Sequence, residues 1–256
     1  LIWISITLIV ILATLFQLTL PTSLWIVLAA YCLYNVYMEF MASAIFIAPG
    51  PPKASIDSIE WNSHLRTFDS ITTHVLSFKQ DHTAPLIVFI HGWRGSSASV
   101  HARADWFATK GWHVVICELP GHGQSTSIPR WNALTAAKHM QYHIKHLDAI
   151  IDSNLVNQIF FYGHSMGGYI CTRLSSDEDN IPYDLPLSGL ILESPLMLYS
   201  RILEEIQRKL KIPSFLQNLL LKRVFRDVRA MHPSITSQNL DQFDIPLWSV
   251  PRVPIL

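Results

Sequence analysis

An apolar run that leads into a Gly-x-Ser-x-Gly pattern constrains the fold of this chain most. Residues 159–162 have the composition of a buried strand, and Gly163-His164-Ser165-Met166-Gly167 follows directly. A strand, a tight turn and a stretch compatible with a helix form the context that presents a serine as a nucleophile. Glycines flank such a serine because the turn leaves no room for a Cβ. The pattern therefore predicts Ser165 as a nucleophile, although the same letters also occur by chance in loops rich in glycine and serine.

Other apolar runs predict further strands of the same sheet. Residues 65–68 and 72–78 alternate between apolar and polar side chains around a turn at Asp69-Ser70. Continuous apolar runs are typical of strands buried on both faces, and they occupy residues 86–90, 113–117, 159–162 and 189–194. Helical spacing predicts intervening helices over residues 97–109 and 132–151, the latter capped by Asn132. Strands that alternate with helices predict an α/β fold with a mostly parallel sheet and helices on both faces.

The N-terminal 48 residues are predicted to form two membrane-spanning helices. Residues 1–20 carry no charged side chain, and residues 24–47 form a second apolar segment interrupted by Asn35 and Glu39. At about 1.5 Å per residue, 20 helical residues cross a hydrocarbon core of roughly 30 Å. The alternatives are a cleaved signal peptide for the first segment and an interfacial helix for the second. A signal peptide would show a basic flank and a small-residue cleavage site, and neither is visible.

The residues after the second apolar segment set the expected domain boundaries. A linker of residues 49–57, which contains Pro49-Gly50-Pro51-Pro52, leads into a domain of residues 58–256. Lys53 is the first basic residue, and the cations that follow it favour a cytoplasmic position for this domain by the positive-inside rule. We therefore expect a membrane-anchored, multi-pass protein with a membrane as one partner.

Charge and cysteine content exclude several other classes of protein. The chain has 19 basic and 19 acidic residues, so it lacks the net positive charge that is typical of nucleic-acid binding. Its three cysteines show no spacing typical of a disulfide framework or a metal site. His139 and His143 are four residues apart, but the acidic partner of a zinc-binding helix is missing. We expect no metal and no cofactor.

Four sequence blocks together resemble a known superfamily. They are His-Gly-Trp at 91–93, Pro-Gly-His-Gly-Gln-Ser at 120–125, Gly-His-Ser-Met-Gly-Gly at 163–168 and Glu-Ser-Pro at 193–195. In this order they are similar to the α/β-hydrolase superfamily, and most similar to its monoacylglycerol-lipase and serine-aminopeptidase-like branches. The resemblance covers residues 58–256 and implies an inserted helical cap at residues 196–244. Amphipathic stretches on both sides of Pro213 fit such a cap, and they fit an ordinary core-facing helix pair equally well.

The resemblance also implies a catalytic site. Ser165 would be the nucleophile, and the backbone N–H groups of Met166 and Trp93 would form the oxyanion hole. The expected reaction is hydrolysis of a carboxylic ester through an acyl-enzyme, with a small-molecule or lipid ester such as a monoacylglycerol or a lysophospholipid as substrate. A serine-aminopeptidase-like peptidase and a non-catalytic protein of the same fold are the alternatives.

The histidines do not supply an evident catalytic base. We expect His164 to be structural, His91 to support the oxyanion loop, His122 to hold its turn, and His139, His143 and His146 to form a solvated face. The order of the triad in this superfamily is Ser, then Asp or Glu, then His, and the only histidine after Ser165 is His232. His232 lies within the expected cap, and residues 250–256 look like the start of the next strand. We therefore expect the catalytic Asp and His to be absent from this chain, which alone would then be nearly inactive.

A basic cluster accompanies the expected cap. It consists of Lys209, Lys211, Lys222, Arg223, Arg226 and Arg229. We expect a solvated face here, with contact to anionic lipid headgroups as the alternative.

Overall fold

The computed structural model describes most of the chain. The described residues are 21–44, 46–47, 56, 60–175, 185–209, 211–231 and 251–256. The first predicted membrane helix, His232 and most of the predicted linker lie outside them. The described residues form two compact units, one with those up to Phe46 and from Glu205 to Met231, the other with those from Ile47 to Glu204 and the C-terminal six.

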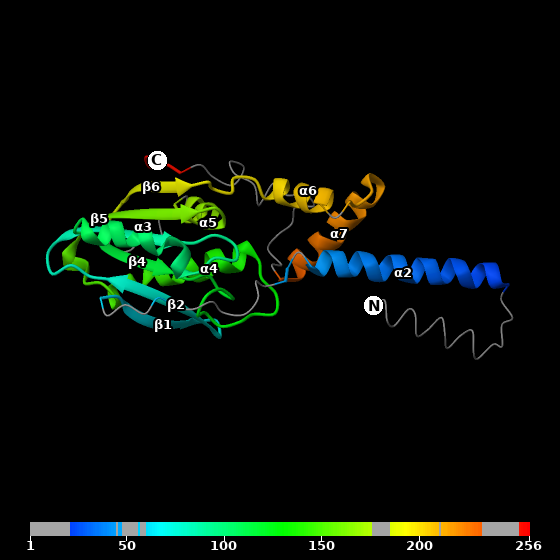
Figure 1. Ribbon diagram of the computed structural model, residues 1–256, viewed down its shortest axis with the longest axis horizontal. Coiled ribbons are helices and arrows are strands. Elements are labelled where there is room, and N and C mark those ends of the chain that lie inside the picture. The colour runs from blue at the N-terminus through cyan, green and yellow to red at the C-terminus, as the bar shows by residue number, and fades with distance from the viewer. Residues whose placement is uncertain are drawn as a thin grey trace. The chain divides into compact units, whose positions relative to one another are not determined.

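The larger unit is built on a mixed, mostly parallel sheet (Figure 1). Its strands are β1 (Asn62–Phe68), β2 (Ile71–Phe78), β3 (Ala84–Ile90), β4 (His113–Cys117), β5 (Val156–His164) and β6 (Leu187–Glu193). Their order in space is β1-β2-β4-β3-β5-β6. The β1–β2 hairpin and the β2–β4 pair are antiparallel, whereas the β4–β3, β3–β5 and β5–β6 pairs are parallel. The predicted α/β class with a mostly parallel sheet is confirmed.

Helices cover both faces of this sheet, as predicted. Along β3, Leu86, Val88 and Ile90 pack into the cluster that contains α4 (Ala133–Lys145) and α5 (Met166–Leu174). Ile87 and Phe89 pack into the opposite cluster, which contains α3 (Ser97–Thr109). Because successive side chains of a strand point to opposite faces, an uninterrupted apolar run is what a strand between two helix layers requires.

The β1–β2 hairpin corrects one expectation about α4. His139 and His143 are buried, at 1% and 0% exposure, rather than part of a solvated face. The ring of His139 lies edge-on to Phe68 with centroids 5.1 Å apart, and His143 Nε2 forms a hydrogen bond with Thr73 Oγ1. The hairpin contributes these two partners, so it extends the buried arc of the helix beyond its apolar residues. His146, by contrast, is exposed.

Helix α4 also ends earlier than its periodicity suggests. Asn132 caps it as predicted, because its Oδ1 accepts a hydrogen bond from Thr135 N at 2.8 Å. The regular helix stops at Lys145, and a short 3₁₀ turn, Leu147–Ala149, follows. The apolar spacing therefore continues across a change of helix type, which sequence periodicity does not distinguish.

The C-terminal residues lie beside β6. Ile255 forms a parallel bridge with Leu190. Leu190 N donates to Pro254 O and Leu256 N donates to Leu190 O, both at 2.9 Å. The segment therefore lies beside β6 and parallel to it, as expected of a further strand of the sheet.

The smaller unit contains α2 (Thr22–Ala44), α7 (Ser214–Met231) and the end of α6 (Tyr199–Lys209). Residues Trp25–Ala44 of α2 are long and apolar enough to cross a membrane, and no other helix among the described residues meets that criterion. Large apolar side chains on α2 are exposed, including Ile26, Leu33 and Phe40 at 64–71%. Helix α2 packs against α7, whose Leu220, Val224 and Val228 are buried.

Candidate active site

Ser165 lies on the turn between β5 and α5. Its backbone has φ 52° and ψ −112°, a region that a residue with a side chain rarely adopts. Ser165 N donates to Glu193 O at 3.0 Å, and Ser165 O accepts from Gly168 N at 3.0 Å and Leu196 N at 2.9 Å. Hydrogen bonds from both sides of the turn therefore hold the serine in a strained conformation at the carboxyl end of its strand.

The glycines beside Ser165 have the steric role that the pattern predicts. A Cβ on Gly163 would lie 2.5 Å from Gly168 Cα, and a Cβ on Gly167 would overlap the carbonyl oxygen of Ile90. The first turn of α5 thus lies directly against β5 and against the end of β3. Only residues without a side chain allow this approach.

The loop after β3 lies against this turn. A Cβ on Gly92 would lie 3.1 Å from Ser165 Cβ and 2.9 Å from His164 Nδ1. Gly95 N donates to Gly92 O at 3.0 Å and closes a tight turn around Trp93. The structure therefore brings the segment that carries the Trp93 amide next to Ser165.

Met166 and Trp93, the residues expected to supply the two oxyanion-hole amides, lie on the two segments that adjoin Ser165. Met166 is the first residue of α5, and the first N–H groups of a helix have no acceptor within the helix. The Trp93 indole packs edge-on against Trp131 at 4.5 Å and His122 at 5.2 Å between ring centroids. This side chain is thus part of an aromatic cluster.

His91 and His122 make the supporting contacts that we expected. His91 Nδ1 donates to Gly92 O at 2.8 Å, and its Nε2 accepts from Leu119 N at 3.2 Å. These contacts define the tautomer, because a carbonyl requires a donor and an amide requires an acceptor. His122 Nδ1 donates to Pro120 O at 2.9 Å. The two imidazoles connect the loops that follow β3 and β4.

Glu118 is a buried carboxylate whose role the sequence did not reveal. It is 1% exposed and accepts hydrogen bonds from Ser97 N at 2.8 Å and Gln124 N at 2.6 Å. His74 Nδ1 lies 3.3 Å from its Oε2. Burial raises the pKa of this carboxyl, but the hydrogen bonds from His74, Ser97 and Gln124 outweigh burial and hold the pKa at about 2. An acidic residue directly after a buried strand was the available signal.

Glu193 fixes the end of β6 beside the serine turn. Arg103 Nη2 donates to its Oε1 at 2.5 Å, and Tyr162 OH donates to its Oε2. The hydrogen bond from Tyr162, together with that from Arg103, lowers the pKa of Glu193 despite partial burial. Burial and the bond to Glu193 raise the pKa of Tyr162. The same residue therefore anchors α3 through its side chain and holds Ser165 N through its carbonyl oxygen.

Three histidines of the larger unit have their hydrogen-bond partners away from Ser165. His64 bonds Ser77, His113 bonds Leu155 O, and His143 bonds Thr73. Among the described residues, no hydrogen bond joins Ser165 Oγ to a histidine. His232 lies outside those residues. Within the same part of the chain, no group of three or more His, Cys, Asp or Glu residues is placed to hold a metal ion.

Residues 85–251 match the family described as alpha/beta hydrolase fold, and the chain belongs to this family. Phospholipase YtpA from Bacillus subtilis (strain 168) is 31% identical over 127 residues, which are 47% of this chain and 44% of that protein. The bifunctional esterase/perhydrolase DCH from Acinetobacter calcoaceticus is 33% identical over 98 residues, 37% of this chain and 33% of that protein. The chain thus matches less than half the length of either relative.

A solved structure shows the same fold. The Pyrococcus furiosus esterase Pf2001 superimposes with a TM-score of 0.57 at 14% identity, over 82% of this chain and 75% of that one. The chain therefore has the α/β-hydrolase fold, and its relatives include proteins named as an esterase and as a phospholipase.

Proposed function

We propose that the gene product is a membrane-anchored serine hydrolase that cleaves carboxylic esters through an acyl-enzyme on Ser165. The observation that carries this proposal is the strained turn of Ser165 between β5 and α5, with the Met166 and Trp93 amides on the two adjoining segments. A non-glycine residue is held in such a conformation only where the surroundings enforce it, and here four backbone hydrogen bonds to its N–H and C=O do so.

The reaction follows from this arrangement. Ser165 Oγ attacks the ester carbonyl carbon and loses its proton to a base, and the carbonyl π electrons move to the oxygen. The Met166 and Trp93 N–H groups donate to that oxyanion, each contributing about 3 kcal/mol to the transition state. Collapse of the tetrahedral intermediate breaks the bond to the alcohol, which leaves with a proton. Water then hydrolyses the acyl-enzyme by the same steps and returns free serine and a carboxylic acid.

The proposed substrates are lipid-derived esters such as monoacylglycerols and lysophospholipids. Support comes from the apolar helix α2 and from a relative named as a phospholipase. Attachment to a membrane would keep the enzyme next to insoluble esters. We also propose that residues 1–20 cross the membrane as a second helix and that the hydrolase unit faces the cytoplasm. Resistance to alkaline extraction and protease protection of tagged ends test this topology.

A covalent probe tests the nucleophile. The full natural reading frame, expressed in membranes, is treated with a fluorescent fluorophosphonate and compared with the Ser165→Ala variant. Ser194→Ala is a matched control, because Ser194 is exposed, also follows a strand and also has a positive φ of 46°. We expect labelling of the wild type and of Ser194→Ala, and none of Ser165→Ala. Labelling that persists in Ser165→Ala refutes the assignment, and a wild type that stays unlabelled supports a non-catalytic protein.

A substrate comparison tests the ester preference. The same preparations are assayed with p-nitrophenyl esters of increasing chain length, with a monoacylglycerol, with a lysophospholipid and with aminoacyl anilides. Turnover of long-chain esters that Ser165→Ala abolishes is the expected result. Turnover of anilides without turnover of esters would show a peptidase instead.

A further inference from the structure

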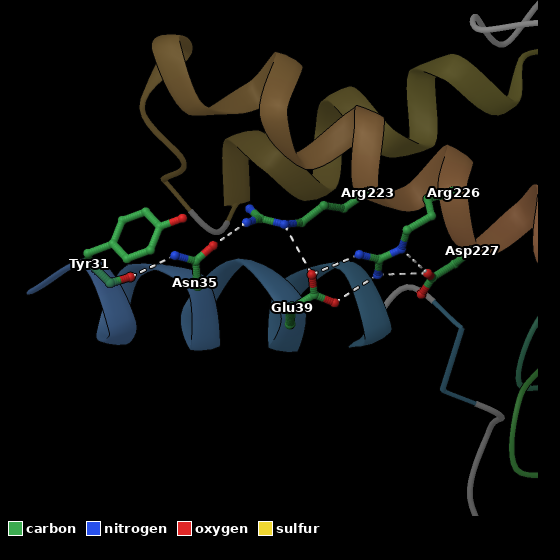
Figure 2. Close-up of polar contacts among 6 residues, drawn as sticks. All are labelled: Tyr31, Asn35, Glu39, Arg223, Arg226 and Asp227. Atoms are coloured by element: carbon green, nitrogen blue, oxygen red, sulfur yellow. Dashed lines mark hydrogen bonds and ion pairs between the residues drawn. The ribbon is translucent and has the colours of Figure 1, made fainter. Parts of the chain in front are cut away.

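Helices α2 and α7 are joined by a network of polar side chains (Figure 2). Glu39 on α2 accepts hydrogen bonds from Arg226 Nη1 at 3.0 Å and Nη2 at 2.8 Å, and Arg223 Nε lies 3.2 Å from its Oε1. Arg223 Nη2 also donates to Asn35 Oδ1 at 2.7 Å. Two of the basic residues predicted as a solvated face are therefore bound to the apolar helix, and Arg223 is only 19% exposed.

The position of Glu39 sets the level of α7 along the candidate span. A carboxylate inside an apolar span is costly unless it is paired, and two guanidinium groups pair this one. Glu39 lies five residues before Ala44, the last residue of the span, which is about 8 Å along a helix. With α2 in the membrane, as proposed above, this pairing holds the middle and end of α7 near the C-terminal end of the span, where the hydrocarbon core meets the headgroups.

The outward face of α7 has the composition of a headgroup-binding surface. Its exposed residues Phe215, Leu219, Lys222 and Arg229 are spaced by four, three and seven positions, so they share one side of the helix. The two apolar side chains lie in its first half and the two cations in its second. Residues 211–231 contain five basic residues and one acidic residue, Asp227, which bonds Arg226.

We propose that this face of α7 binds the anionic phospholipid headgroups that surround the C-terminal end of α2. Two observations support a lipid surface as the occupant. The face is continuous with a helix whose own exposed side chains are apolar, and its charge is complementary to that of anionic lipids. Each basic residue close to such a surface increases binding about fivefold. Helix α7 is then a membrane-binding part of the smaller unit, a role that goes beyond ester hydrolysis.

Site-specific lysine labelling tests this proposal on the full chain. The protein is reconstituted into nanodiscs of phosphatidylcholine alone or with phosphatidylglycerol, and lysines are acetylated briefly and quantified by mass spectrometry. Lys110 and Lys138 are exposed on the larger unit and serve as internal references. We expect the acetylation of Lys222 relative to these references to fall about threefold or more with phosphatidylglycerol, and to recover at high salt.

A pair of variants identifies the face that is responsible. Phe215→Ser/Arg229→Glu changes the outward face of α7 and leaves Lys222 as the reporter. Leu65→Ser/Lys145→Glu is the matched control, because it removes an equally exposed apolar side chain and an exposed cation from the larger unit. Loss of lipid-dependent protection in the first variant alone supports the proposal. Equal labelling of wild-type Lys222 in both lipids overturns it, and so does protection that depends on protein concentration, which would indicate a second copy as the occupant.

Discussion

Replacement of the buried carboxylate of Glu118 provides a quantitative test of the structure. Glu118→Gln keeps the size of the side chain but removes its charge. It also places an amide N–H₂ group opposite a backbone N–H group that donates to the carboxylate in the wild type. The carboxylate accepts from two backbone N–H groups, Ser97 N at the start of α3 and Gln124 N in the loop after β4. The glutamine amide keeps one carbonyl oxygen, so one of these two donors loses its acceptor and faces an N–H₂ group instead. Both the charge and the hydrogen-bond geometry therefore oppose this substitution.

The expected cost follows from the pKa of the carboxyl. A pKa of about 2 in the folded protein, against an ordinary value of 4.5, corresponds to about 3 kcal/mol of stability at neutral pH. Because the folded pKa is the lower one, this contribution is complete above pH 4.5 and is lost as the pH falls toward 2. At pH 3.5 about 2 kcal/mol of it remains. The penalty of Glu118→Gln should accordingly be smaller at pH 3.5 than at pH 7, by about 1 kcal/mol.

Urea unfolding in a non-ionic detergent, followed by tryptophan fluorescence, measures both penalties. Trp61 and Trp131 are buried in the larger unit and report on its unfolding. Glu204→Gln is the control, because Glu204 is exposed in an ion pair with Arg201 and should change stability by no more than about 0.5 kcal/mol at either pH. A penalty at pH 7 below about 1 kcal/mol, or one that does not shrink at pH 3.5, would show that the ionised carboxylate does not hold these segments together.

Three further substitutions test other parts of the structure. Burial, with help from the positive charge of Arg66, holds the pKa of His143 at about 3. Because the unfolded chain therefore binds this proton at a higher pH, the free energy of unfolding of the wild type should fall as the pH drops from 6.5 toward 3. His143→Leu should flatten this fall in unfolding measurements between about pH 7.5 and pH 4. Gly167→Ala should lower stability by about 1–3 kcal/mol and abolish fluorophosphonate labelling, because its Cβ would overlap the Ile90 carbonyl; a variant of wild-type stability and labelling contradicts the geometry of the turn. Asn132→Ala should cost about 1 kcal/mol in urea unfolding through loss of the cap of α4, and an unchanged midpoint would show that the cap does not contribute.

The sequence predicted strands well where both faces of the strand are buried. Strand β4 and helix α3 have the predicted bounds, His113–Cys117 and Ser97–Thr109. The apolar runs of β3 and β4 are buried between two helix layers, so their composition alone reveals their place. The turn at Ser165 was predictable for a related reason, because its glycines report a steric requirement that is local to the turn.

The errors arose where burial depends on a distant segment. His139 and His143 differ from solvated helix residues only because Phe68 and Thr73 cover them. Periodicity shows which residues share a helix face, but not how wide the covered arc becomes when a hairpin packs beside it. Glu118 was missed for a similar reason, since two of its partners belong to β2 and α3 rather than to its own loop.

The same limitation applies to α7. Its sequence shows an apolar stripe and a basic cluster, and the apolar stripe fits a cap over an active site as well as a core-facing helix pair. The choice of partner depends on Glu39, which lies 187 positions from Arg226 in the sequence. Only the tertiary structure shows that the carboxylate of the apolar helix and the guanidinium groups of α7 neutralise each other.

Helix α3 connects the supports on the two sides of Ser165. At its N-terminus, Ser97 N donates to Glu118, which also holds the loop after β4. Two turns later, Arg103 donates to Glu193, whose carbonyl oxygen accepts from Ser165 N. A single rigid helix thus fixes both the loop after β4 and the end of β6. The polar residues at this edge of the sheet stabilise the position of Ser165, and their burial costs are offset by the hydrogen bonds that they accept and donate.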